Sequence, residues 1–437
     1  MRDGGRIAAA IEVLGDVDRT RRPVQDALKD WGLAHRFAGS RDRSAIGNLV
    51  FDALRCRASL AARMGSDSPR ALALAAYVRL WGRSIEQLDA TLAEDRHAPE
   101  PLTDAERAGL VAPVLPEGTP LWQAADVPEW LEGSLRRAFG DRFVEEGAAL
   151  AGRADVDLRV NPLKSDRDTV LKSLDHLDAR PCRHSPFGVR VPSGAADEKP
   201  PHVASELSYK KGWFEIQDEG SQLAALMALA RPGEQAVDFC AGAGGKALAL
   251  AAAMDNKGQI YAYDSDRRRF GDILERIARS GARNIQIREP KRGDVLADLA
   301  GRIDVVLVDA PCTGSGTWRR RPDAKWRLAP GALETRQREQ ASVLADGARL
   351  VRPGGRLVYV TCSVLPEENE DQVAAFLAAH PDFRLGDTAA AWRAVTGTVA
   401  DPLTVLSLGD DGGTALRLTP ATTGTDGFFC AVLNRQG

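Results

Sequence analysis

The sequence predicts an α/β fold, in which a doubly wound, mostly parallel sheet follows a small α/β subdomain and an all-α N-terminal domain. The main observation is a change of rhythm after about residue 205, where short apolar runs alternate with helical patterns. Such alternation is typical of a parallel sheet with helices on both faces. Strands are expected at 235–239, 259–263, 285–288, 303–308, 356–361 and 428–433, and helices at 216–230, 245–254, 266–280, 331–350 and 367–379.

Two further domains are expected before the large sheet. Residues 1–125 should form a helical domain, because apolar side chains recur at helical spacing and no strand-like alternation competes. Prolines between 99 and 120 indicate a linker at its end. Residues 126–204 should form the small α/β subdomain, whose first strand ends at a turn near Asn161. Residues 205–437 then form the domain that carries the large sheet.

Composition excludes several classes of protein. The chain has 437 residues, of which 44% are hydrophobic and 27% charged, as in ordinary globular proteins. No stretch approaches the ~20 apolar residues that cross a bilayer, and the N-terminus has no signal-peptide pattern, so we expect a cytoplasmic protein without membrane contact. The six cysteines and six histidines are scattered, with no Cys-x-x-Cys pair, which disfavours a disulfide framework or a metal site.

A glycine-rich turn between an expected strand and an expected helix indicates a cofactor site. It consists of Cys240, Ala241, Gly242, Ala243, Gly244, Gly245 and Lys246. Such a turn lets a ligand approach backbone N–H groups at the helix N-terminus. Ala247 rules out the usual P-loop pattern. Asp264 and Asp294 follow the next two strands and are placed to meet ribose hydroxyls and an adenine amino group, which favours an adenosine-containing ligand.

Two cysteines are expected at the carboxyl ends of sheet strands. Strand 303–308 leads into Asp309 and Cys312, and strand 356–361 leads into Cys362. Residues in these positions face the ligand crevice of an open parallel sheet. A thiolate that adds to carbon 6 of a pyrimidine activates carbon 5 towards a methyl sulfonium, and a carboxyl group such as that of Asp309 can stabilise the N3 edge. The alternative is a pair of buried structural thiols.

These segments are similar to a known family. The runs 309–316 and 319–326, together with 360–363 and 366–370, resemble the Sun (Fmu/RsmB-like) family of S-adenosylmethionine-dependent RNA cytosine-5 methyltransferases, and the likeness extends from about residue 128 to the end. It implies a class I methyltransferase fold of the Rossmann-like type. It also implies that Cys362 is the nucleophile and that Cys312 assists product release.

The same resemblance implies the remaining site residues. The S-adenosylmethionine pocket would be lined by the turn Cys240–Lys246 with Asp264, Arg269, Asp294 and Asp309. The glycine turn departs from the family, because its usual proline is Ala243 here, and this loss should loosen the turn. A basic and aromatic cluster is expected to contact RNA, and it consists of Arg319, Arg320, Arg321, Lys325 and Trp326.

The expected partner is RNA. The pattern from Ser40 to Arg55 resembles a NusB-like RNA-binding domain that precedes family members acting on 16S rRNA. We therefore expect an rRNA substrate, with tRNA as the alternative, and a monomer without metal. Two other readings stay open. One is a non-catalytic RNA-binding scaffold, and the other is a methyltransferase acting on DNA or on a protein amide.

Overall fold

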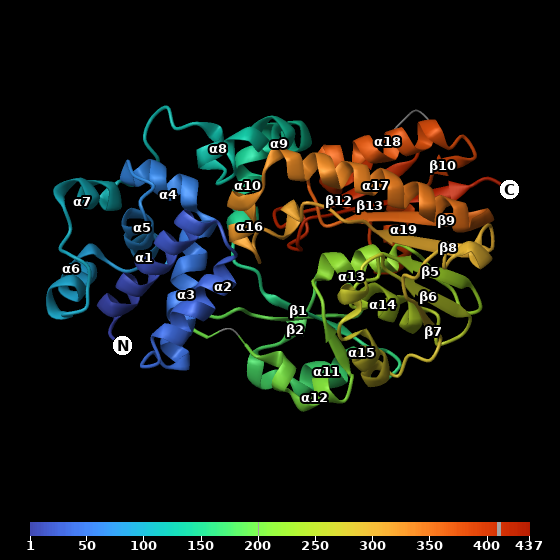
Figure 1. Ribbon diagram of the computed structural model, residues 1–437, viewed down its shortest axis with the longest axis horizontal. Coiled ribbons are helices and arrows are strands. Elements are labelled where there is room, and N and C mark those ends of the chain that lie inside the picture. Colours follow the sequence, from blue (N-terminus) through green and yellow to red (C-terminus); the bar gives the residue numbers. More distant parts are fainter. Residues whose placement is uncertain (200, 409–411) are drawn as a thin grey trace. The chain divides into compact units, whose positions relative to one another are not determined.

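The computed structural model describes residues 1–199, 201–408 and 412–437, and its internal contacts divide the chain into two compact units (Figure 1). The helical unit comprises Met1–Arg153, Ser193–Pro200 and Trp318–Leu328. The sheet unit comprises Ala154–Pro192, Pro201–Thr317 and Ala329–Gly437. The division therefore follows packing and not chain order.

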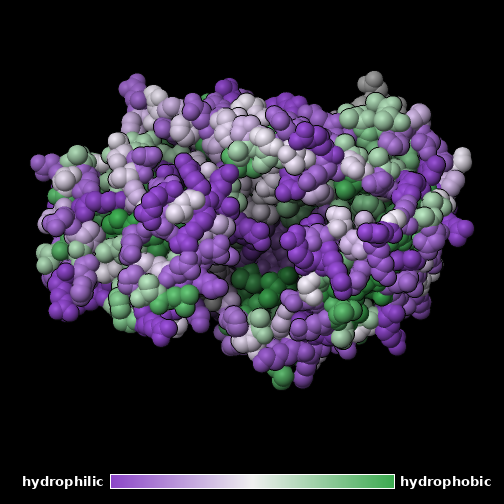
Figure 2. Space-filling view, in the orientation of Figure 1, coloured by the Kyte–Doolittle hydropathy of each residue, from purple (hydrophilic) through white to green (hydrophobic). Residues whose placement is uncertain are grey.

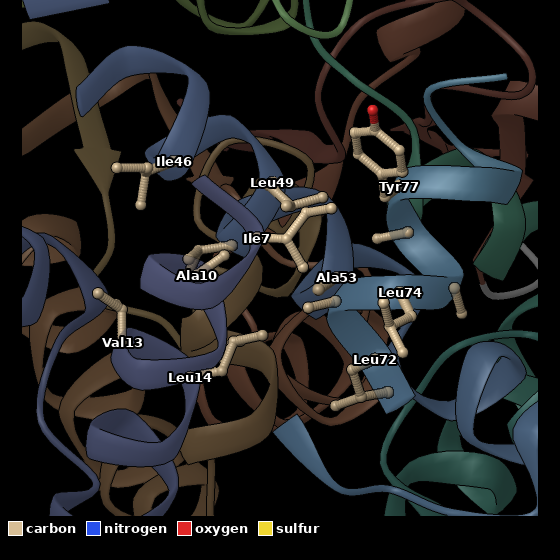
Figure 3. Close-up of a cluster of buried hydrophobic side chains, with 14 of the residues drawn as sticks. Ile7, Ala10, Val13, Leu14, Ile46, Leu49, Ala53, Leu72, Leu74 and Tyr77 are labelled. Carbon is tan, nitrogen blue, oxygen red and sulfur yellow. The ribbon is translucent and has the colours of Figure 1, made fainter. Parts of the chain in front are cut away.

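The helical unit is built almost wholly of helices, as expected. They are α1 Asp3–Thr20, α2 Val24–Ala34, α3 Ser40–Arg55, α4 Arg57–Met64, α5 Pro69–Arg79, α6 Ile85–Glu94, α7 Asp104–Val111, α8 Leu121–Ala124, α9 Glu132–Phe139 and α10 Phe143–Ala151. Local sequence explains several starts, since Ser84 and Thr103 form capping boxes at α6 and α7. Side chains of α1, α3 and α5, among them Ile7, Leu49 and Leu72, form one apolar core (Figure 3).

An internal segment of the sequence also belongs to the helical unit. Residues Trp318–Leu328, which include α16 (Pro322–Arg327), pack with the C-terminal end of α3. The Lys325 ammonium donates to the Arg55 carbonyl at 2.8 Å, and the Trp326 indole N–H donates to the Leu54 carbonyl at 2.6 Å. These are carbonyls that a helix end leaves without partners in its own backbone. We call this segment the strap.

The sheet unit contains a large sheet of nine strands within the described residues. They are β5 Gln235–Phe239, β6 Gln259–Tyr263, β7 Ile285–Arg288, β8 Ile303–Asp309, β9 Val351–Thr361, β10 Phe383–Leu385, β11 Val405–Ser407, β12 Thr414–Leu418 and β13 Phe428–Arg435. Their order is β11-β12-β13-β9-β8-β5-β6-β7, and β10 pairs with β13. The run from β9 to β7 is parallel, and β10 to β13 pair antiparallel to their neighbours.

Helices cover both faces of this sheet. They are α13 Glu219–Leu226, α14 Gly245–Ala253, α15 Ile273–Ser280, α17 Pro330–Leu350, α18 Glu370–Ala379 and α19 Thr388–Thr396. Successive residues of β8 belong to different cores: Leu307 packs with α13, α14 and α19, and Val308 packs with α17 and α18 (Figure 1). This alternation is that of a strand buried on both sides. The expected doubly wound, Rossmann-like α/β fold is confirmed.

The small sheet precedes the large one in the chain. Its strands are β1 Val156–Val160, β2 Arg180–Pro181, β3 Gly188–Val191 and β4 Phe214–Ile216, in the antiparallel order β2-β3-β1-β4, and its helices are α11 Arg167–Ser173 and α12 Leu207–Lys210. Leu158, Val189 and Phe214 are among the side chains that form its core. The small sheet belongs to the sheet unit, whereas α9 and α10, which we expected beside it, belong to the helical unit, where α10 packs with α8 and α9.

The surface has the mixture expected of a globular protein. Hydrophilic side chains dominate the face drawn in Figure 2, and hydrophobic ones appear in scattered groups. Among the described helices, none is both long enough and apolar enough to span a bilayer.

Candidate active site

The two cysteines that follow β8 and β9 lie side by side. These strands are parallel neighbours, so their carboxyl ends meet at one edge of the sheet. The Cys312 and Cys362 sulfur atoms are 3.4 Å apart, and both residues are only partly exposed. The hydrogen bond to Cys362 and burial raise the pKa of Cys312 well above its usual value, so Cys312 keeps its proton. The geometry therefore places a protonated thiol against the Cys362 sulfur.

An ion pair lies at the same edge. The Lys246 ammonium, at the start of α14, is 2.6 Å from a carboxylate oxygen of Asp309, at the end of β8. Burial opposes the charge of Lys246, but Asp309, Asp238 and Cys362 together raise its pKa. Lys246 is therefore a fixed cation beside the thiol pair, in spite of its place at a helix N-terminus, where a cation is otherwise unfavourable.

The glycine turn is held by charged side chains from other elements. The Arg159 guanidinium, on β1, donates to the Gly245 carbonyl at 2.7 Å and also to the Gln217 side chain. Arg276, on α15, donates to the Ala243 carbonyl at 2.8 Å. Gly244 has a positive φ of 79°, and a Cβ there would lie 2.7 Å from Ile273. The turn that we expected to be loosened by the missing proline is thus fastened at two carbonyls.

We expect Arg159→Met to weaken S-adenosylmethionine binding about tenfold, because a charge-assisted bond to the turn contributes roughly 1.5–3 kcal/mol. Isothermal titration calorimetry would measure the change. Arg356→Met is the matched control, since Arg356 is also largely buried but bonds to the Ala228 and Leu229 carbonyls and to Glu234. Equal dissociation constants for Arg159→Met and wild type would contradict the fastening role.

The other residues expected at the cofactor site have clear partners. Asp264 is buried, accepts from the Gly242 amide at 3.0 Å, and pairs with Arg269 at 3.3 Å. Asp294 accepts from the Leu296 amide and pairs with Arg349. The structure therefore joins Asp264 and Arg269 to the glycine turn, whereas Asp294 is engaged by a guanidinium that we did not anticipate.

Two models of protein families match this chain. The family model described as 16S rRNA methyltransferase RsmB/F matches residues 225–434, and one described as a ferredoxin-like domain of RsmF/B-like methyltransferases matches 127–196. Ribosomal RNA small subunit methyltransferase B of Thermus thermophilus is 31% identical over 452 residues, which cover 100% of this chain and 99% of that protein. The chain belongs to the RsmB/F family.

Further relatives agree with this membership. Ribosomal RNA small subunit methyltransferase B of Sodalis glossinidius is 32% identical over 71% of this chain, and the match spans 66% of that protein's length. The crystal structure of a methyltransferase homologue from Pyrococcus horikoshii has a TM-score of 0.57 and 26% identity, over 72% of this chain and 97% of that one. The expected family is confirmed.

One buried carboxylate in this RsmB/F chain was passed over by the sequence reasoning. Asp238, on β5, is 0% exposed, and within the described ranges no side chain donates a hydrogen bond to its carboxylate; the Ala247 amide is the backbone group directed at it. A buried carboxylate with so few donors is costly. It lies two residues before the glycine turn, where its negative charge would favour the cationic end of S-adenosylmethionine. Its polar side chain in an apolar strand was the available signal.

The protonation of Asp238 gives a test by pH. Burial and, secondly, Asp309 raise its pKa to about 7, against the opposing effect of Lys246. The folded state then holds a proton that the unfolded state releases, so stability falls as pH rises from about 4 to about 7. We expect Asp238→Asn without cofactor to gain roughly 2–4 kcal/mol relative to wild type between pH 5 and pH 8. Urea unfolding at pH 5 and at pH 8 would measure this gain in stability. Parallel stability profiles for Asp238→Asn and wild type would contradict it.

The basic cluster expected to bind RNA is only partly accessible. Arg319 is 7% exposed and Lys325 is 1% exposed, and Lys325 and Trp326 both bond to carbonyls of α3. The expectation that Lys325 and Arg319 contact RNA is corrected by this burial, because both side chains are buried within the helical unit. Arg320 is half-buried, and Arg321 is exposed. In the described part of the chain, no group of acidic, His and Cys side chains could hold a metal ion.

Proposed function

We propose that the protein transfers a methyl group to carbon 5 of a cytosine in RNA, with 16S rRNA as the substrate. The main observation in support of this proposal is that the Cys312 and Cys362 sulfur atoms lie 3.4 Å apart, next to the Lys246–Asp309 ion pair. Relatives named ribosomal RNA small subunit methyltransferase B support the choice of RNA. RNA would be the partner, and the protein would act as a monomer in the cytoplasm.

Cys362 is the proposed nucleophile. Its sulfur adds to carbon 6 of the cytosine, which makes carbon 5 electron-rich enough to attack a methyl group. S-adenosylmethionine, when bound at the glycine turn, supplies that methyl group as an electrophile on a sulfonium. The proton on Cys312 keeps that thiol from competing as a second anion. For Cys362 to leave after transfer, a base must take the proton from carbon 5 while the bond between carbon 6 and the Cys362 sulfur breaks, and Cys312 assists this release.

Asp309 and Lys246 have a supporting role in this proposal. Negative charge develops along the N3 edge of the ring when the thiolate adds, and stabilising it requires a proton or a cation held in place. Asp309 reaches that edge, and the ammonium of Lys246 supplies the fixed positive charge behind it. Because the cysteine attacks from above the ring, the target base must leave its stack, as in other enzymes that modify bases.

Bisulfite sequencing of total RNA from cells with and without the gene tests this function. Loss of one cytosine mark that returns with wild type but not with Cys362→Ala would name the substrate. A cytosine mark that is lost from tRNA, and not from rRNA, in cells without the gene would select the tRNA alternative. If neither RNA changes, the proposed substrate is wrong, and calorimetry with S-adenosylmethionine would then separate a binding scaffold from an enzyme with another substrate.

Contact of the strap with RNA is proposed for Arg321 and not for Lys325. We expect Arg321→Gln to lower RNA affinity and to reduce the salt slope by about one, because one phosphate contact is lost. Lys325→Gln should instead lower stability by about 1–3 kcal/mol, because the charged donor to the Arg55 carbonyl is replaced by a shorter neutral amide, and leave the salt slope unchanged. Filter binding at several salt concentrations, with thermal unfolding, separates the two. A reduced slope for folded Lys325→Gln would reverse the assignment.

A further inference from the structure

One buried carboxylate is bonded to both cysteine loops. Glu368, the last residue of the short 3₁₀ helix η8 (Pro366–Glu368), is 0% exposed. It accepts from the backbone N–H and the hydroxyl of Thr313, the residue after Cys312, at 2.8 and 2.5 Å. It also accepts from the hydroxyl of Ser363, the residue after Cys362. The two loops that carry the sulfur atoms therefore share one anchor.

A helix on the same face adds a second attachment to this anchor. Gln340, on α17, is fully buried and donates to Glu368 at 3.0 Å and to the Pro311 carbonyl at 2.9 Å. Gln340 thus links the carboxylate to the residue before Cys312. Every donor around Glu368 in these contacts points at its carboxylate, and such charge-assisted bonds are about twice as strong as neutral ones.

The loops are also joined directly to each other. The Ser315 and Ser363 hydroxyl oxygens are 2.9 Å apart, and the Gly316 amide donates to the Cys362 carbonyl at 3.0 Å. These bonds connect the loops at Cys362 itself and at the residues that follow the cysteines. Glu368 adds bonds to the residue directly after each cysteine, so one carboxylate holds both loops next to the two sulfur atoms.

We propose that Glu368 is a positioning residue that sets the separation of the Cys312 and Cys362 sulfur atoms. The importance of that separation for methyl transfer rests on the proposed function. In that function one sulfur adds to the ring and the other assists release, so both sulfur atoms must lie near the same ring. The positioning itself is a property of the folded chain. A displacement of about 1 Å can cost as much as 100-fold in rate when reacting groups are held by their surroundings.

Closure of a disulfide between the two cysteines reports this separation without RNA or cofactor. Hydrogen peroxide oxidises one thiol to a sulfenic acid and water, and the other sulfur then displaces water to give the disulfide. In sum, two thiols and one peroxide give one disulfide and two waters. The second step depends on how near the sulfurs are, whereas alkylation of either thiol by iodoacetamide depends only on its own exposure and ionisation.

The main variant is Glu368→Gln, which keeps the shape but replaces an accepting oxygen by an NH2 group. We expect peroxide-driven closure, followed by intact mass, to slow about tenfold or more. The turnover number for RNA methylation should fall similarly, with the KM for RNA and the dissociation constant of S-adenosylmethionine within about twofold of wild type. Glu339→Gln is the matched control, because Glu339 is next to Gln340 but pairs with Arg336 on the exposed side of α17.

A second variant keeps the proposal testable if Glu368→Gln does not fold. Thr313→Val removes one hydroxyl donor to Glu368 at a half-buried position and keeps the backbone bond. It should slow closure about threefold, in the same direction, as one of the shared bonds is lost. Wild-type closure rates in the folded variants would overturn the positioning role. The variants could show the expected slower closure while the wild-type protein methylates no RNA. In that case the positioning role of Glu368 stands, and only the proposed function is refuted.

Discussion

Cys362→Ala should reduce RNA methylation by on the order of 10⁴-fold or more, because the thiol that forms the bond to carbon 6 is removed and the protonated Cys312 thiol beside it is a poor substitute. Binding of S-adenosylmethionine should be nearly unchanged, since the glycine turn is fastened by Arg159 and Arg276 and not by the thiols. Single-turnover transfer of a labelled methyl group to the RNA identified by bisulfite sequencing would measure the loss.

Cys312→Ala should give a different defect from Cys362→Ala. With the nucleophile intact and the assisting thiol removed, the covalent complex between protein and RNA should accumulate and migrate slowly on a denaturing gel. Cys56→Ala is the control, because Cys56 is the residue that follows α3 in the helical unit and is not part of either cysteine loop. An adduct that accumulates with Cys362→Ala, and not with Cys312→Ala, would exchange the two roles.

Lys246→Met should lower both activity and stability. Lys246 pairs with Asp309, and its charge also opposes the high pKa of Asp238, so its removal leaves two carboxylates without their cation. Because Asp309 is one third exposed, the loss should lie below the roughly 3–5 kcal/mol that breaking a fully buried pair from one side costs. Loss of a fixed charge where negative charge develops costs on the order of 10²–10³-fold in rate.

Urea unfolding and single-turnover methylation would separate these two effects of Lys246→Met. Lys257→Met is the matched control, since Lys257 pairs with Asp255 on an exposed surface and such pairs contribute about 0–1 kcal/mol. The double variant Lys246→Met with Asp238→Asn should recover part of the stability but not the rate. Wild-type methylation by folded Lys246→Met would refute the role given to its charge.

Much of the sheet could be predicted because its strands are locally distinct. The runs at 235–239, 259–263 and 285–288 were predicted with the bounds that the structure shows. Three short antiparallel strands, β10, β11 and β12, were missed. Each has three to five residues, and their pairing with distant partners, not their local pattern, stabilises them as strands.

The candidate site could be predicted only where chain order determines it. Two cysteines at the carboxyl ends of adjacent parallel strands must approach each other, and the structure shows Cys312 beside Cys362. The fate of Lys325 could not be inferred in this way, because its partner carbonyl lies 270 residues away in the sequence. The same is true of Arg159, whose bond to Gly245 joins a strand of the small sheet to the start of α14.

The strap has a consequence for how this protein could have been assembled in evolution. Its residues Trp318–Leu328 follow the Cys312 loop directly in sequence, yet their packing partners are helices near the N-terminus. A helical domain added at one end of an ancestral enzyme would need no such internal piece. Exchange of the N-terminal domain between relatives by recombination at a single junction would leave Trp318 and Lys325, both 1% exposed here, without their surroundings. The helical unit and the strap should therefore be inherited together, and hybrids should fold only when both come from one parent.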